Sequence, residues 1–306
     1  MKIDYVTLDV FTERSFGGNP LAVIPDARGV DAAQMQAIAA EFNYSETTFV
    51  LPPDNPAHTV RVRIFTPTDE IPFAGHPNVG TAFVLGRQPT LFGRPVADRM
   101  IFEEQAGLVH IELLRESGVV TGAGFVAPRR LEIGDEVEAP MLAACVSLPP
   151  EAIVVQAHGP RIVSVGLPFA VAELKDLDAL AAARPDTAAF AAAGKKHWHR
   201  DDRFSVFVYV RTGDGIGNLR ARMFAPLSNI PEDPATGSAS AALSAYLASL
   251  DPRDDAVFDI AIAQGVEMGR PSAIGVQIRK AGGAVESVRI SGRCVPMMQG
   301  KLTLHE

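Results

Sequence analysis

The sequence of 306 residues contains only two cysteines, Cys145 and Cys294, which lie far apart and form no close pairing motif. A disulfide framework or a thiolate metal site is therefore not expected. No apolar run approaches the ~18 residues of a membrane span. The N-terminal residues enter a strand pattern at once, without the apolar core of a signal peptide. We therefore expect a cytoplasmic protein with no membrane partner.

The chain also lacks an excess of positive charge. Its formal net charge is −8, and no cluster of Lys and Arg with interleaved aromatic residues occurs along it. A nucleic-acid partner is therefore not expected, because it would require a basic face. The chain does have the composition of an ordinary soluble globular protein, with 47% hydrophobic and 21% charged residues. It is long enough for two domains with full hydrophobic cores.

One motif occurs twice, once in each half. The first copy occupies residues 63–67 and 75–82, and the second occupies 222–226 and 232–239. Placing Pro77 opposite Pro234 aligns His76 with Asp233, and each proline is followed three residues later by Gly and a small hydroxyl residue. A repeat of this length usually means two similar domains related by a pseudo-two-fold axis. A pocket faced by His76 and Asp233 is then a candidate active site.

Apolar and polar residues alternate as in strands throughout both halves, and each half carries one long central helix. Asp31 is predicted to cap a helix that runs to about Asn43. The motif copies open two further helices, which run from Pro77 to about Leu85 and over Pro234–Leu250. The stretch Gly118–Pro128 has little periodicity and is the expected boundary region.

These elements predict an α+β fold of two pseudo-symmetric domains, residues 1–122 and 123–306. Each domain is expected to be a curved, mostly antiparallel sheet wrapped around its central helix. The last strand is able to cross over to the first domain. The active site is expected in the cleft between the domains.

The prolines of the motif suggest how a substrate would be held. Pro77 and Pro234 are each predicted at the first helical position, where a missing N–H costs nothing. The N–H groups that follow lack helical acceptors, and two such helix starts would suit a carboxylate. Gly80 and Gly237 would allow close packing against the sheet. Asp233 alone is better interpreted as an ordinary N-cap, and the pairing with His76 at an equivalent position is what favours a site.

Glu46 is the third candidate. It follows the helix that ends at Asn43 and precedes the apolar Phe49 and Val50. Desolvation there could raise its pKa and suit it for moving a proton from one carbon to another. From local sequence alone, a solvated loop glutamate is the favoured interpretation.

At these positions the chain resembles the phenazine-biosynthesis PhzF-like family, which shares the diaminopimelate epimerase fold. The resemblance covers essentially the whole chain and contains many ordered matches. The matching segments are residues 9–11, 18–23, 43–47, 65–67, 70–77, 233–239, 264–265 and 269–272.

The resemblance implies a cofactor-independent isomerase without a metal. In the family, the residue matching Glu46 shuttles a proton between carbons of a cyclic dihydro-hydroxyanthranilate, and those matching His76 and Asp233 bind and polarise the substrate. Four positions are implied to bind substrate: Asn19, Gly75, Gly237 and Ser238. Related epimerases have catalytic cysteines at the two helix starts, and this chain has none there. The resemblance also implies a homodimer that binds a small carboxylate.

Two other functions remain open, namely a cysteine-free amino-acid epimerase or racemase of the same fold and a non-catalytic ligand-binding protein. Three further features are weaker. Residues 213–218 favour a hairpin turn over a phosphate loop. His197 and His199 form a possible metal pair, but no third ligand is evident and a solvated loop is favoured. Arg270 could bind a substrate carboxylate or brace its domain.

Overall fold

The computed structural model describes residues 1–197 and 204–304. They form a mixed fold of many strands and few helices, which confirms the α+β class. The chain divides into two compact units, Met1–Pro128 with Ile290–Glu306, and Arg129–Arg289. The division lies after residue 128 and not after 122, because strand β10 (Val119–Val126) pairs with β9 (Gly107–Glu116) of the first unit along its length.

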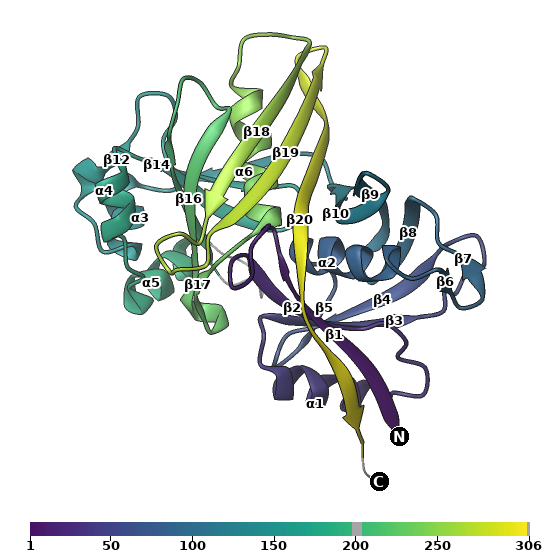
Figure 1. Ribbon diagram of the computed structural model, residues 1–306. Helices are drawn as coiled ribbons and strands as arrows, with labels where there is room; N and C mark the ends of the chain where they lie inside the picture. Colours follow the sequence, from purple (N-terminus) through teal and green to yellow (C-terminus); the bar gives the residue numbers. More distant parts are fainter. Residues whose placement is uncertain (198–203, 305–306) are drawn as a thin grey trace. The chain divides into compact units, whose positions relative to one another are not determined.

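The first unit contains α1, α2 and most of a sheet built on β1 to β5 and β8 to β10 (Figure 1). Its elements are β1 Lys2–Val10, β2 Asn19–Ile24, α1 Ala32–Phe42, β3 Glu46–Leu51, β4 Val60–Phe65, β5 Glu70–Ile71, α2 Gly75–Gly86, β6 Thr90–Leu91, β7 Arg94–Pro95, β8 Arg99–Glu104, β9 Gly107–Glu116 and β10. Strand β20 (Ala284–Thr303) returns to this unit and pairs antiparallel with β1.

Helix α2 is the central helix of the first unit. All its residues are buried, and it contacts β1, β2, β3, β9 and β10 (Figure 1). The predicted close approach at Gly80 is confirmed, because a Cβ there would lie 2.5 Å from Leu21 Cδ2 and 2.8 Å from Val10 Cγ2. The helix that carries His76 is therefore held tightly on the sheet.

Helix α1 begins and ends as its sequence predicts. Asp31 is the N-cap, and its side chain accepts a hydrogen bond of 2.8 Å from Gln34 N in a capping box. Asn43 is the C-cap in the left-handed conformation, with φ 51°. The buried face of α1 packs on a core that includes Phe49 and Phe65. This packing fixes the short connection that leads into β3.

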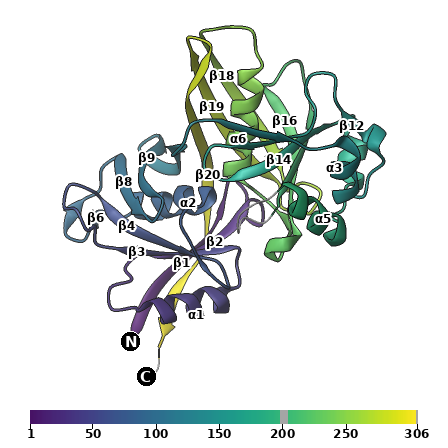
Figure 2. The same cartoon turned by 180° about the vertical axis from the view of Figure 1, so that it is seen from behind.

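The second unit, several of whose elements are labelled in Figure 2, repeats the strand pairing of the first. Its elements are β11 Glu132–Glu136, α3 Ala139–Cys145, η1 Pro150–Ala152, β12 Ile153–Val154, β13 Arg161–Ser164, β14 Pro168–Leu174, α4 Leu177–Ala182, α5 Thr187–His197, β15 Val206–Arg211, β16 Asn218–Ala225, η2 Pro226–Ser228, β17 Ile230–Asp233, α6 Gly237–Ser249, β18 Ala256–Gln264, β19 Ser272–Ala281 and the first part of β20. Strands β13, β14, β15, β16, β17 and β18 pair with one another as β1, β2, β3, β4, β5 and β8 do, in that order. Helix α6 packs on the strands of its own unit, as α2 does.

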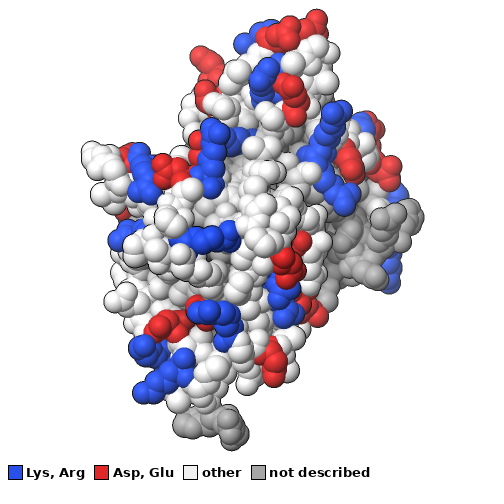
Figure 3. Space-filling view, turned by 90° about the vertical axis from the view of Figure 1, so that its right-hand side faces the viewer, with Lys and Arg blue, Asp and Glu red and all other residues white. Residues whose placement is uncertain are grey.

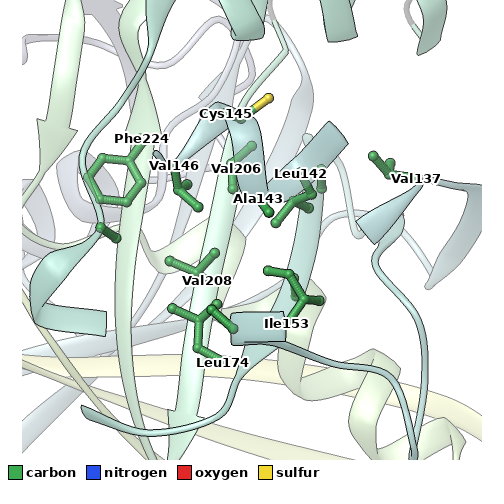
Figure 4. Packing of buried hydrophobic residues seen from close by; sticks show 14 of the residues in the cluster. Val137, Leu142, Ala143, Cys145, Val146, Ile153, Leu174, Val206, Val208 and Phe224 are labelled. Carbon is green, nitrogen blue, oxygen red and sulfur yellow. The ribbon is translucent and has the colours of Figure 1, made fainter. Parts of the chain in front are cut away.

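The core of the second unit lies between α3, α5 and the sheet. Figure 4 shows side chains of and next to α3, among them Leu142 and Val146, beside Val206, Val208 and Phe224 of the sheet. Fully burying each such aliphatic or aromatic side chain contributes about 1.5–3 kcal/mol. Cys145 also belongs to this core, and burial raises the pKa of its thiol to about 12. Burial likewise raises the pKa of Cys294. Neither cysteine is therefore an activated nucleophile.

Two properties of the described residues bear on possible partners, namely the apolar character of the helices and the distribution of charged side chains on the surface. No helix of residues 1–197 or 204–304 has both the length and the apolar character needed to cross a membrane. On the face that Figure 3 displays, Lys and Arg side chains are interspersed with Asp and Glu.

Candidate functional site

Glu46 and His76 lie together in the first unit. Glu46 is the first residue of β3 and His76 is the second residue of α2. Glu46 Oε2 and His76 Nε2 are 3.3 Å apart, with side-chain exposures of 14% and 5%. The structure therefore brings two of the three sequence-predicted catalytic residues into one buried contact, although 29 residues separate them in the sequence.

The imidazole of His76 is neutral at physiological pH. Burial lowers the pKa of His76 from its ordinary 6.5 to about 3. The contact with Glu46 is therefore between a carboxyl group and a neutral ring, and not an ion pair. A neutral imidazole can donate from one nitrogen and accept at the other, so it can polarise a bound group without adding charge.

Asn19 is positioned beside Glu46 by parallel strand pairing. Leu21 of β2 is the register partner of Glu46, and Asn19 lies two residues earlier on the same strand. Asn19 is fully buried, and Ser45 Oγ donates a hydrogen bond of 3.1 Å to its Oδ1. This contact ties the start of β2 to the residue that precedes Glu46.

The start of α2 differs from the sequence prediction. Ala74 is the N-cap and Gly75 the first helical residue, so His76 is the second and Pro77 the third. His76 is therefore not an N-cap, and Pro77 is not at the first position. The first N–H groups of a helix have no acceptor within it, so a proline is tolerated at the third residue as well as the first.

Helix α6 differs from its prediction in the opposite direction, since it begins after the predicted residue and not before it. Thr236 is its N-cap and Gly237 its first residue, so Pro234 lies before the helix. Asp233 is the last residue of β17 and does not cap the helix. The cap prediction fails because a segment of three residues, Pro234 to Thr236, separates the strand end from the helix.

Asp233 is nevertheless held in a dense hydrogen-bond network. Thr236 Oγ1 donates to Asp233 Oδ2 at 2.5 Å, and Gln264 Nε2 donates to the carbonyl of Asp233 at 2.7 Å. Ser272 Oγ donates to the carbonyl of Pro234 at 2.8 Å. Gly265 has φ +71°, and a Cβ there would lie 2.6 Å from Pro234 O. The turn that carries Asp233 is therefore held by the hydrogen bonds of Thr236, Gln264 and Ser272 and by the close approach of Gly265.

Strand register corrects the alignment of the repeat. Ile71 is the partner of Ile64, and Asp233 is the partner of Met223 one residue after the second motif arginine. The proline shared by the two copies is therefore Pro72 with Pro234, and Asp233 matches Ile71. His76 then matches Ser238, each as the second residue of its helix. The predicted pairing of His76 with Asp233 is wrong.

Each copy of the motif contains a matching ion pair, which supports the corrected alignment. Arg63 binds Glu70 through two hydrogen bonds of 2.7 and 2.6 Å, and Arg222 binds Glu232 through two of 2.8 Å. The guanidinium groups also lie over matching rings, Arg63 over Phe65 at 5.1 Å and Arg222 over Phe224 at 4.9 Å. The two copies of the motif thus share one local structure up to the helix start.

Glu46 of the first unit has no acidic counterpart in the second unit. Thr47 pairs with Phe65 as Val206 pairs with Phe224, so the residue before each, Glu46 and Ser205, are counterparts. The helix starts, by contrast, are alike in both units, with Gly75 and His76 in one and Gly237 and Ser238 in the other. The repeated part can hold an anion on helix N–H groups, and the unrepeated Glu46 can exchange a proton.

The weaker candidates are resolved in part. The segment 213–218 joins β15 to β16 as the predicted hairpin, with Thr212 N donating to Asn218 O at 3.0 Å. His197 Nε2 lies 3.7 Å from Glu138 Oε2, whereas Trp198 and His199 are outside the described residues. Residues 1–197 and 204–304 contain no group of three or more His, Cys, Asp or Glu placed to hold a metal.

Sequence reasoning missed two residues beside the helix starts, Glu104 and Gln264. Gln264 belongs to a segment of the family pattern but carried no role. Glu104 follows Glu103, and two consecutive glutamates are typical of a solvated surface. Only strand alternation, which turns one of them inward, could have indicated it.

Comparison with known proteins identifies similar sequences and a similar fold. A family model described as "Phenazine biosynthesis-like protein" matches residues 8–300. A protein named an uncharacterized isomerase, from Mesorhizobium japonicum, is 40% identical over 304 residues and 98% of each chain. A trans-2,3-dihydro-3-hydroxyanthranilate isomerase from Pseudomonas chlororaphis is 36% identical over 98% of this chain and 99% of its own. A PhzF-family structure from Bacillus anthracis has the same fold, with TM-score 0.87 and 24% identity over 99% of this chain and 100% of that one.

Proposed function

The chain belongs to the phenazine biosynthesis-like protein family, whose relatives at this similarity are named isomerases, and we propose that it moves a proton on a small carboxylated substrate. The reaction, with or without a shift of a double bond, is proposed to resemble that of trans-2,3-dihydro-3-hydroxyanthranilate isomerase. The observation that carries the proposal is the buried contact of 3.3 Å between Glu46 and His76.

Glu46 is the proposed general acid/base. Its carboxylate takes a proton from a substrate carbon, so that the C–H electron pair enters the conjugated system of the substrate. The resulting carboxylic acid then returns the proton to another carbon. No oxidant or second reactant is needed, because the substrate and the product have the same composition. Positioned proton transfer of this kind typically contributes 10²–10⁴-fold to the rate.

His76 is proposed to orient the reacting carbon and to stabilise the intermediate. Negative charge develops on the substrate when the proton leaves, and a preorganised N–H donor stabilises that charge. Because burial keeps the ring neutral, His76 does not compete with the substrate for the proton on Glu46. Its donor can remain in place through both transfers.

The substrate carboxylate is proposed to bind the N–H groups at the helix starts, Gly75 in the first unit and Gly237 and Ser238 in the second. These groups lack acceptors within the helix, and the helix dipole favours an anion at this end. Asn19 and Asp233 are proposed to fix the polar substituents of the ring. The cleft between two domains that the sequence predicts belongs to this proposal, as do action without a cofactor and assembly as a homodimer in the cytoplasm.

Replacing Glu46 by Gln tests the assignment. The amide keeps the shape of the side chain but cannot accept a proton from carbon. With trans-2,3-dihydro-3-hydroxyanthranilate and related cyclic carboxylates as substrates, kcat is expected to fall by roughly 10²–10⁴-fold. Glu41→Gln is the control, since Glu41 is exposed on α1 and precedes Glu46 closely. Retained turnover in Glu46→Gln would remove Glu46 from the mechanism.

A further inference from the structure

Gln264 braces the turn that leads into α6. Its Oε1 accepts the backbone N–H of Thr236 at 3.0 Å, and its Nε2 donates to the carbonyl of Asp233 at 2.7 Å and to Thr236 Oγ1 at 3.0 Å. Gln264 is fully buried. One side chain thus supplies both an acceptor and a donor to the segment that positions the second helix start.

Glu104 occupies the same position in the first unit. Arg61 pairs with Glu103 in the parallel pair β4–β8, and Arg220 pairs with Ala263 in the parallel pair β16–β18. Because Arg63 and Arg222 are counterparts, Arg61 matches Arg220. One residue further along each outer strand, Glu104 matches Gln264.

The carboxyl group of Glu104 lacks the well-formed hydrogen bonds that the side chain of Gln264 makes. Both carboxyl oxygens are buried, and neither has a partner in good hydrogen-bond geometry among residues 1–197 and 204–304, although the Asn78 side chain is close enough to lower the pKa of Glu104. Asn78 Oδ1, on α2, is equally buried and without a partner in the same part of the chain. The Asn78 amide Nδ2 donates to the carbonyl of Ala74, the N-cap of α2, at 3.1 Å. A donor proton on Glu104 would match this excess of acceptor oxygens.

We propose that Glu104 is a positioning residue that, as a neutral carboxylic acid, holds the turn before α2 and thereby His76, as Gln264 holds the turn before α6. A protonated carboxyl group and a carboxamide each present one acceptor oxygen beside one donor. Glu104 therefore reproduces the donor and acceptor pattern of its counterpart only while it keeps its proton.

The pKa of Glu104 agrees with this role. Burial raises it from the ordinary 4.5 to about 8, and the Asn78 side chain opposes the shift. The charged or titratable side chains of the neighbouring β4, β5, β8, β9 and α2 are Arg61, Arg63, Glu70, His76, Arg99, Glu103, His110, Glu112, Arg115 and Glu116. Arg63 and Glu70 bind each other, and Glu103 binds the backbone of residues 54 and 55. None of these charges is among the causes of the shift.

The dependence of stability on pH tests the proposal without any substrate. The unfolded chain releases this proton near pH 4.5 and the folded protein only near pH 8. Ionisation therefore favours unfolding increasingly as pH rises between these values. Glu104→Gln escapes this effect, so the difference in Tm between the variant and the wild type is expected to grow from pH 4.5 to 8 and then to level off. Glu41→Gln, an exposed control, is expected to show no such growth.

Activity supplies a second readout, which rests on the proposed function. The wild type is expected to lose kcat above about pH 8, whereas Glu104→Gln is expected to keep kcat within about twofold of the wild type at lower pH and to show no such fall. In Glu104→Ala, which provides no donor, kcat is expected to fall on the order of 10- to 100-fold, because small displacements of groups in an active site lower the rate strongly.

Two results would overturn the proposal. One is a Tm difference for Glu104→Gln that does not change with pH, which would mean that Glu104 is ionised when folded. The other is a Glu104→Gln enzyme as slow as Glu104→Ala. If the wild type turned over no tested substrate, the proposed function would fail, while the Tm measurement would still decide the role of Glu104.

Discussion

Glu46 Oε2 and His76 Nε2 lie 3.3 Å apart in the first unit, and both side chains are largely buried. The pair joins the first residue of a strand to the second residue of a central helix. Burial lowers the pKa of His76 to about 3, so a neutral ring faces the carboxyl group. The arrangement combines a group that can take a proton with a donor that carries no charge of its own.

The neutrality of His76 predicts a pH effect on stability. The folded pKa lies below the ordinary 6.5, so protonation favours unfolding as pH falls through the range between 6.5 and 3. From pH 6.5 to 5 this group alone is expected to remove about 2 kcal/mol of the free energy of unfolding. In urea unfolding, the free energy of unfolding of His76→Gln is expected to fall correspondingly less over this pH interval than that of the wild type. Equal losses in the two proteins would show that His76 is charged in the folded state.

Thr236 is expected to matter through its hydroxyl group. Its Oγ1 donates to Asp233 Oδ2 and accepts from Gln264 Nε2. Thr236→Val keeps the shape but leaves a buried carboxylate short of a donor, which should lower the free energy of unfolding by about 1–3 kcal/mol. Thr236→Ser should restore most of the loss. If valine and serine behaved alike, the hydrogen bonds of this turn would be unimportant for stability.

Gly80 is expected to be intolerant of any side chain. A Cβ there would lie 2.5 Å from Leu21 Cδ2, so Gly80→Ala should destabilise the protein by about 1–3 kcal/mol through overpacking. Gly194 in α5 is the matched control, because its Cβ would make only ordinary contacts, the shortest 3.5 Å to Phe204 Cβ. Gly194→Ala should be neutral or stabilising by about 0.5–1 kcal/mol. Thermal unfolding of both variants would check this, and similar effects at the two sites would contradict the packing argument.

Local signals predicted the parts of this structure that local interactions determine. Asp31 and Asn43 bound α1 because caps act within a few residues of the helix end. The sequence of the repeat allows two alignments, because either Pro72 or Pro77 can be placed opposite Pro234, and the predicted choice of Pro77 is wrong. Choosing between the two requires the register of β4 with β5 and of β16 with β17, which is a property of pairing and not of the sequence of either copy.

Two other features depended on contacts that no local pattern reports. The proximity of Glu46 and His76 was implied by family resemblance and not by spacing. Residues 103 and 104 are both glutamates, yet Glu103 binds the backbone of a loop, whereas the carboxyl oxygens of Glu104 are buried. Which carboxyl group turns inward depends on the pairing of β8 with its neighbours.

The most direct test of proton transfer through Glu46 is the incorporation of solvent deuterium into the product. In D₂O, wild-type turnover of a cyclic carboxylate substrate is expected to place deuterium at the carbon that receives the proton, since the carboxyl group of Glu46 can exchange with solvent. Glu46→Gln is expected to form product, and to exchange deuterium into recovered substrate, roughly 10²–10⁴-fold more slowly than the wild type. Deuterium incorporation at the wild-type rate by Glu46→Gln would contradict the account.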